Sequence, residues 1–248
     1  MKQQLTISFI ISLFLCCSVT LHAQEEEVEM KKDSIQLRYG LRLGTDASKL
    51  IRTALDDDYS GFEINGDYRL SKDLFIAGEI GNEEKITTND FLSVTAKGSY
   101  FKVGFDYNLY DNWIGTDDMI YTGFRVGAST FSQTRTNYTV YTTNQYWEPQ
   151  FSSSENVEFS SLSAIWVELI LGLKAEVLTN LYIGANVQLK GMITQDQPVD
   201  FENLYVPGFT KTFDSGRIGV GYGYSVSYLI PIFKKNRNKV ITKKEVDN

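Results

Sequence analysis

The sequence predicts an all-β protein, an eight-stranded antiparallel up-and-down transmembrane β-barrel with long outer loops. Three observations support this prediction. Apolar and polar residues alternate in eight separate segments of the chain. The connections between these segments are alternately long and short. The polar face of the alternation carries charged side chains in the middle of the segments, which a lipid-facing surface would not tolerate.

The N-terminal segment has the pattern of a secretory signal. Lys2 precedes an apolar stretch, and Leu21-His22-Ala23 supplies a small residue at the expected cleavage site. We expect residues 1–23 to be a cleaved signal peptide and the polar residues 24–34 to be a flexible periplasmic leader. The two cysteines and the single histidine of the sequence lie before residue 24, so the expected mature chain has neither a thiol nor an imidazole.

Strict alternation begins at Ile35, where Ile35, Leu37 and Tyr39 share one face and Gln36 and Arg38 share the other. The same period of two recurs seven more times. The expected strands are residues 35–44, 62–70, 74–81, 101–109, 120–128, 165–177, 181–190 and 218–232. We therefore predict one barrel over residues 35–233, followed by a basic periplasmic tail over residues 234–248.

The expected connections differ in length according to the end of the barrel on which they lie. Residues 71–73 and 179–180 form tight turns, and residues 111–118 form a moderately short one. The long polar connections are residues 45–60, 83–97, 133–160 and 193–215. Short periplasmic turns and long outer loops are typical of barrels in the outer membrane of Gram-negative bacteria, which is the location that we expect.

The charged face decides which side of the barrel is apolar. A soluble periplasmic lipocalin-like ligand-binding barrel remains an alternative, and it would place apolar side chains inside and charged ones in water. Because basic and acidic residues nearly balance on the polar face, we instead expect paired charges that fill the lumen. The expected luminal charge network is Arg38, Arg42, Glu63, Asp67, Arg69, Glu79, Lys102, Asp106, Arg125, Glu168, Lys174, Glu176 and Lys190.

Aromatic residues near the strand ends support the membrane interpretation. Aromatic girdles at the two interfaces are expected from Tyr39, Tyr68, Tyr100, Tyr107, Tyr110, Tyr121, Tyr182 and Tyr228. The last strand ends at Phe233 and resembles the closing strand that the barrel-assembly machinery recognises during insertion. The partners that follow from this location are that machinery, outer-membrane lipid and lipopolysaccharide.

Three segments of the chain resemble a known family. They are Ile64-Asn65-Gly66-Asp67-Tyr68-Arg69-Leu70, the stretch from Lys97 to Asn108, and Asn203-Leu204-Tyr205-Val206-Pro207-Gly208-Phe209. They are similar to an uncharacterised family of Bacteroidota outer-membrane barrels, domain of unknown function 6048. The resemblance covers most of the expected mature chain. It implies a barrel and its location, but no catalytic or binding residues.

The chain offers little for catalysis or for cofactors. The barrel enzymes of this membrane use a histidine, and the only histidine lies in the expected signal peptide, so we expect no enzyme, no catalytic residue and no cofactor. Gly219-Val220-Gly221-Tyr222-Gly223 has no following helix, so it is not expected to bind a dinucleotide. Asp56-Asp57-Asp58 is interpreted as a solvated acidic loop and not as a metal site. The formal net charge of −7 argues against nucleic-acid binding.

The third long loop is the candidate recognition surface, for a glycan or a protein ligand. Its aromatic residues are Tyr138, Tyr141, Tyr146, Trp147 and Phe151. We therefore expect a non-enzymatic outer-membrane barrel that serves envelope structure or recognition. Two alternatives stay open besides the lipocalin-like barrel: a narrow porin-like pore, and an accessory subunit of an uptake or secretion complex.

Overall fold

The computed structural model describes residues 36–110, 117–140, 151–199, 201–211 and 216–236. The expected signal peptide, the leader and most of the C-terminal tail lie outside these residues. The elements are β1 (Gln36–Asp46), α2 (Ala47–Leu55), β2 (Tyr59–Arg69), β3 (Leu74–Thr88), β4 (Leu92–Asn108), β5 (Met119–Thr139), β6 (Ser152–Ser153), β7 (Val157–Leu178), β8 (Leu181–Gln195), β9 (Tyr205–Val206), β10 (Thr210–Lys211) and β11 (Ile218–Asn236).

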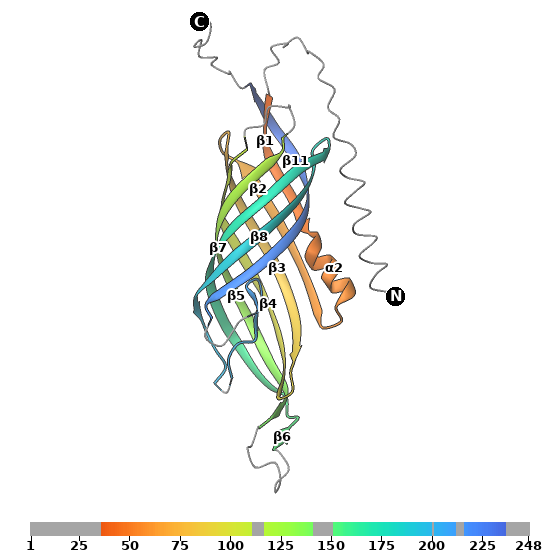
Figure 1. Ribbon diagram of the computed structural model, residues 1–248, viewed down its shortest axis with the longest axis vertical. Coiled ribbons are helices and arrows are strands. Elements are labelled where there is room, and N and C mark those ends of the chain that lie inside the picture. The colour runs from red at the N-terminus through yellow and green to blue at the C-terminus, as the bar shows by residue number, and fades with distance from the viewer. Residues whose placement is uncertain (1–35, 111–116, 141–150, 200, 212–215, 237–248) are drawn as a thin grey trace, which may run out of the picture. The chain divides into compact units, whose positions relative to one another are not determined.

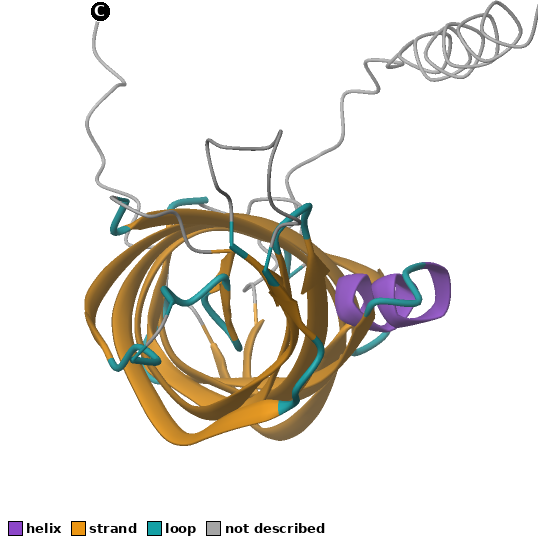
Figure 2. Ribbon diagram, turned by 90° about the horizontal axis from the view of Figure 1, so that it is seen from below, coloured by secondary structure: helices purple, strands orange, loops and turns teal. Residues whose placement is uncertain are grey.

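The long strands form a closed ring in which each pairs antiparallel with its neighbours along the chain. The order is β1, β2, β3, β4, β5, β7, β8 and β11, and β11 pairs back onto β1 (Figures 1 and 2). We call the end where β1 begins and β11 ends the terminal end, and the opposite end, where β6 lies, the loop end. The eight-stranded antiparallel up-and-down barrel predicted from the sequence is therefore confirmed.

The stagger of the strands fixes the width of the lumen. Paired residues followed from Leu41 of β1 through every strand lead to Val220 of β11. Val226 of β11 pairs with Thr45 of β1, and continuing this register places Val220 opposite residue 51. A path around the ring that starts at residue 41 therefore returns at residue 51, which is an offset of ten residues. A barrel with this strand number and stagger has an interior that is just wide enough for side chains to fill.

The outer wall is apolar and the lumen is charged, which is the arrangement of a transmembrane barrel. The outward residues that are each more than 40% exposed include Leu43, Ile64, Ile76, Ile80, Phe101, Val103, Phe105, Ile120, Val126, Leu169, Leu171, Leu173, Ile183, Val187, Leu189, Val226 and Ile230. Many of the charged residues on the same strands, by contrast, are buried. A lipocalin-like barrel needs the reverse arrangement, so that alternative is wrong.

The apolar wall ends abruptly toward the loop end. Ile80 pairs with Phe101, Phe101 with Ala128, and Ala128 with Ile165, and all four side chains face outward. The next outward row is fully polar. It consists of Asn82, Ser99, Thr130 and Ser163. This change from apolar to polar residues at one register position on four strands marks one boundary of the membrane-facing belt.

The hairpins of the loop end extend as strands beyond that boundary. β3 continues to Thr88 and β4 begins at Leu92, so the long loop predicted over residues 83–97 is wrong. Likewise β5 reaches Thr139 and β7 starts at Val157, within the loop predicted over 133–160. The outward residues of both hairpins are mostly polar there, with Ile86 as an apolar exception, so the regular alternation that reveals a membrane strand is missing although the backbone pairing continues.

The predicted aromatic girdles are only partly correct. Tyr107 and Tyr228 face outward and are about half exposed. By contrast, four of the tyrosines are buried in the interior: Tyr39, Tyr100, Tyr121 and Tyr182. Tyr39 stacks on Phe233 with ring centroids 4.9 Å apart, and the other three share the face of the luminal charges. A tyrosine buried beside ionised groups uses its hydroxyl as a hydrogen-bond partner, so it suits a polar lumen as well as a membrane interface.

β1 is short and ends at Asp46, and the helix α2 follows it where the strand would otherwise continue toward the loop end. Asp46 caps α2 by accepting a hydrogen bond from the backbone N–H of Ser48 (2.8 Å). The helix packs against β2 and β11, and Figure 2 shows it outside the ring of strands. Its residues Leu50, Ile51 and Leu55 are exposed, as the outward residues of the strands are. No helix in the described part of the chain is long and apolar enough to cross a membrane.

Candidate functional site

Lys102 is the centre of the luminal charge network. Its Nζ lies 2.7 Å from Glu79, 3.5 Å from Glu63 and 3.7 Å from Glu168, and only 2% of its side chain is exposed. Arg125 approaches the other carboxylate oxygen of Glu79 at 3.3 Å. Strands β2, β3, β4, β5 and β7 each contribute one of these side chains, so the cluster ties together strands far apart along the chain.

A second cluster continues the network toward the terminal end. Arg125 contacts Asp106 at 2.7 Å, and Asp106 lies 3.7 Å from the Nζ of Lys174. Lys174 contacts Asp67 at 2.7 Å, and the Nε of Arg42 donates to the other carboxylate oxygen of Asp67 at 2.7 Å. Acidic and basic groups therefore alternate from Lys102 to Arg42, so each of these buried charges has a neighbour of opposite sign.

A third cluster closes the terminal end. Arg38 donates through both terminal nitrogens to Glu176, in the two-pronged geometry that favours guanidinium–carboxylate pairs. Arg69 contacts Asp117 at 2.8 Å, and Arg38 lies 3.9 Å from the same carboxylate. Asp117 belongs to the connection between β4 and β5, so that connection also takes part in filling this end of the lumen.

The loop end is closed differently, by a segment that folds into the mouth of the barrel. We call residues 203–209, between β8 and β11, the plug. Two of its side chains, Val206 and Phe209, are buried as completely as any in the protein. They belong to one apolar cluster with Trp166, and the ring of Phe209 meets the indole of Trp166 edge to face at 6.1 Å. The plug therefore carries its own small apolar core into the barrel.

Polar contacts from two strands, β3 and β8, fix the plug. Glu83 accepts hydrogen bonds from the Tyr205 hydroxyl (2.7 Å) and the Gly208 backbone N–H (2.9 Å). Lys190 donates to the Gly208 carbonyl oxygen (2.7 Å). Gly208 has a φ of +82°, and a Cβ there would lie 2.6 Å from the ring of Tyr100, so only glycine fits. Burial and the charge of Glu83 raise the pKa of Tyr205 well above its ordinary value, which keeps the hydroxyl a neutral donor.

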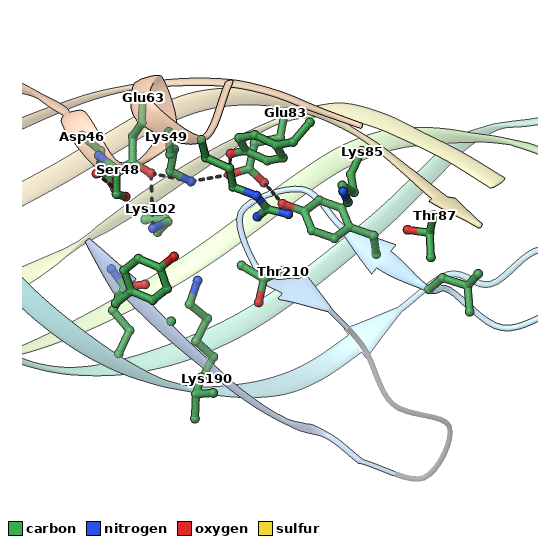
Figure 3. A pocket seen from close by; sticks show the side chains of 18 of the residues that line it. Asp46, Ser48, Lys49, Glu63, Glu83, Lys85, Thr87, Lys102, Lys190 and Thr210 are labelled. Atoms are coloured by element: carbon green, nitrogen blue, oxygen red, sulfur yellow. Dashed lines mark hydrogen bonds and ion pairs between the residues drawn. The ribbon is translucent and has the colours of Figure 1, made fainter. Parts of the chain in front are cut away.

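Lys49 links α2 to the same carboxylate. Its Nζ is paired with Glu83 and lies 3.4 Å from Glu63, and Figure 3 shows the side chain reaching between the two. Burial alone would lower the pKa of Lys49, but the attraction of Glu83 and then of Glu63 raises it overall. The lysine therefore stays a cation and holds the helix against the barrel.

A cavity of about 540 Å³ lies at the loop end between α2, the plug and β11. It is lined by Asp46, Ser48, Lys49, Arg52, Tyr59, Glu63, Glu83, Lys85, Thr87, Thr88, Asn89, Lys102, Gln188, Lys190, Leu204, Tyr205, Thr210, Val220, Gly221 and Tyr222. Figure 3 shows that its polar side chains point into one space from several elements. A smaller cavity of about 40 Å³ adjoins it deeper in the lumen, because Asp46, Glu63 and Gln188 line both. The lumen therefore keeps a sizeable cavity beside the plug at its loop end and is nearly filled deeper inside.

All of the luminal residues expected from the sequence lie inside the barrel and take part in ion pairs. Sequence reasoning missed Lys49, Glu83 and Asp117, because each lies in a segment expected to be a loop. It also missed the plug, although Tyr205 to Phe209 stand out as an apolar run within a polar connection. That run was the available signal of a loop that folds inward.

The other sites considered in the sequence are the candidate recognition loop and the acidic segment at Asp56. In the candidate recognition loop, Tyr138 packs against Phe151 with ring centroids 6.0 Å apart, and the Arg135 guanidinium lies 4.3 Å from the centre of the Tyr138 ring. Tyr141, Tyr146 and Trp147 lie outside the described residues. A hydrogen bond from Lys85 lowers the pKa of Asp56, so this carboxyl is ionised. Among the residues that the structure describes, no three His, Cys, Asp or Glu side chains could together hold a metal ion.

Comparisons with known proteins identify a family and two similar folds. No curated protein matches the chain. The attachment invasion locus protein Ail of Yersinia pestis is 9% identical over 79% of this chain and 99% of that chain, with a TM-score of 0.39. The Neisserial surface protein A, NspA, is 10% identical over 79% of this chain and 97% of that chain, also with a TM-score of 0.39. The family described as "Domain of unknown function (DUF6048)" matches residues 6–235, and the chain belongs to this family.

Proposed function

We propose that this protein is a non-enzymatic barrel of a Gram-negative outer membrane, with a sealed lumen and with outward loops that serve recognition or envelope structure. The observation that carries the proposal is the filling of the lumen by a continuous series of ion pairs from Lys102 to Arg42, a separate ion-pair cluster around Arg38 at the terminal end, and the plug at the loop end. A barrel so filled is suited to hold loops at a surface and not to pass solutes.

The membrane location rests on the outer wall. Large apolar side chains cover it, and exposing so many of them to water would be strongly unfavourable. A closed antiparallel barrel also pairs its backbone groups strand to strand, as the interior of a lipid bilayer requires. Strand-by-strand closure and an apolar exterior together support insertion into the outer membrane.

A cysteine-labelling experiment tests this location. Leu171 lies in the apolar belt and Thr130 in the polar row beyond it, and both side chains face outward and are exposed. We expect a membrane-impermeant maleimide added to whole cells to label Thr130→Cys. We expect it to label Leu171→Cys only after the protein is denatured. Rapid labelling of both variants without detergent would contradict a membrane-embedded barrel.

Conductance measurements test whether the lumen is sealed. We expect the purified protein, inserted into planar bilayers, to give no steady open-channel current, because paired charges occupy the lumen below the plug. A water-filled porin in the same membranes serves as the positive control for insertion and recording. A stable, large conductance would contradict the sealed lumen and would favour the narrow pore.

The long β5–β7 hairpin is the part best placed for recognition. Its strands extend well beyond the polar row at Thr130 and Ser163, to Thr139 in β5 and from Val157 in β7. Phe151 is exposed there beside Tyr138 and Arg135. An exposed aromatic ring beside half-buried aromatic and guanidinium groups on paired strands is typical of surfaces that bind glycans or proteins. The lack of a histidine or cysteine after residue 23 supports a binding role over a catalytic one.

A further inference from the structure

The barrel wall has a gap in its loop-end half. β11 pairs with β1 only from Ser225 onward, so its residues 218–224 pair with β8 on one side and with no strand on the other. β2 pairs with β1 only from Ile64 onward, which leaves Tyr59–Glu63 paired with β3 alone. Unpaired strand edges at membrane depth are tolerated only where they line a polar cavity or are covered by protein.

α2 covers this gap. The hydroxyl of Thr53 donates to the Gly61 carbonyl (3.1 Å) and accepts from the Gly61 N–H (2.8 Å), which pairs the helix with the free edge of β2. The guanidinium of Arg52 lies 4.0 Å from the centre of the Tyr59 ring. On the β11 side, Asp46 accepts from the Tyr224 N–H (3.3 Å), and the structure gives no hydrogen bond between α2 and residues 218–223 among those described. The seal is therefore tighter along β2 than along β11.

The large cavity reaches the outer face around this looser edge. Lys190 and Gln188 line it from inside the barrel, whereas Val220 and Tyr222 belong to its lining although they point outward and are 74% and 67% exposed. A space lined by both faces of one wall has to pass the edge of that wall. Gly221 lies at the crossing, with no side chain to obstruct it.

The lining groups define the chemistry of a ligand. Every lysine and arginine that lines the cavity already has a carboxylate within 4.0 Å. A free anion would have to break one of these pairs, so the cavity is a poor phosphate site. Sugar hydroxyls both donate and accept, so they can bond to a carboxylate and an ammonium of an intact pair. Tyr222, which also lines the cavity and is 67% exposed, adds an aromatic ring face of the kind that packs against sugars.

We propose that this cavity binds a short saccharide, which enters around the edge of β11 beside α2. The volume of about 540 Å³ lies within the range of ordinary small-ligand sites, about 300–1,000 Å³. The sugar can be free or can be the headgroup of a lipid held against the outer wall. The second source, but not the first, rests on the membrane location proposed above.

Detergents that share one alkyl chain test the proposal. The full-length protein, processed by its host and purified in octaethylene glycol dodecyl ether, is titrated with dodecyl maltoside, and the bound molecules are counted by native mass spectrometry. We expect one dodecyl maltoside to be retained. Gly221→Phe fills the crossing, and the nearest atoms to its Cβ are the side-chain ends of Gln188 (2.9 Å) and Lys190 (3.0 Å). We expect this variant to weaken retention about tenfold or more.

Gly191→Phe is the matched control. It places the same side chain on β8, where the nearest atom to the new Cβ belongs to Val167 at 3.6 Å. Gly191 does not line the cavity, so the retention of dodecyl maltoside is expected to be unchanged. Displacement by maltose indicates that the free sugar suffices. Retention that maltose does not displace indicates a lipid-linked sugar. Absence of retention, equal retention by wild type and Gly221→Phe, or equally site-dependent retention of the dodecyl ether would overturn the proposal. The maltose arm needs no membrane, so its result is separable from cysteine labelling.

Discussion

Replacing Lys102 by methionine is expected to lower the free energy of unfolding by about 3–5 kcal/mol, the cost typical of removing one partner from a buried ion pair. Lys102 is the only basic group within 4.0 Å of three different carboxylates among the residues that the structure describes. Without it, Glu63, Glu79 and Glu168 keep one basic neighbour each and repel one another at short range. Guanidinium chloride unfolding of the protein in lipid vesicles measures the change.

Lys97→Met supplies the control on the same strand. Lys97 faces outward beyond the belt, is 63% exposed and contacts Glu84 at 3.0 Å. An exposed pair of this kind contributes about 0–1 kcal/mol, so the same substitution there should change little. Adding Glu79→Gln to Lys102→Met removes one of the three carboxylates that repel one another and should recover about 0.5–3 kcal/mol. Equal losses for Lys102→Met and Lys97→Met would show that the luminal network does not stabilise the fold.

The strands of the membrane belt could be predicted from the sequence because two constraints act on the same residues. Alternation of period two sets the strand, and charges such as Lys102 and Asp106 in the middle of the polar face set which face is inside. The partners within ion pairs such as Arg42–Asp67 could not be predicted from the sequence. Sequence pattern places both residues on the inner face, but the stagger of the barrel decides which of them meet.

The loop end could not be predicted in the same way. Beyond Asn82 and Ser99 the outward residues of β3 and β4 are polar except for Ile86, so these strands continue without the regular alternation that reveals a membrane strand. α2 has only nine residues, and its stability depends on tertiary contacts such as Lys49 with Glu83, which no local pattern displays. The plug depends on a surface that exists only after the barrel closes.

Phe209→Ala is expected to release the plug while the barrel stays folded. Phe209 is buried against Trp166 in the apolar cluster of the mouth, and truncating a buried phenylalanine costs about 3–5 kcal/mol. The loss falls on the plug because residues 203–209 belong to none of the eight barrel strands. The readout is modification of Val206→Cys, a fully buried position in the wild type, by a soluble maleimide. Because the plug would then open at a lower free-energy cost, the maleimide should modify Val206→Cys about a hundredfold faster or more.

Val199→Ala is the matched control for the same connection. Val199 is 94% exposed, so its truncation should leave both the modification rate and the folded barrel unchanged. The folded barrel is followed by its faster migration on a denaturing gel before heating. If Phe209→Ala abolished that folded band, the plug would be part of the cooperative core of the barrel and not a separable closure. If Val206→Cys reacted equally fast with and without Phe209→Ala, the mouth would already be open in the wild type. The plug would then not seal the loop end of the lumen, and this part of the proposed function would be wrong.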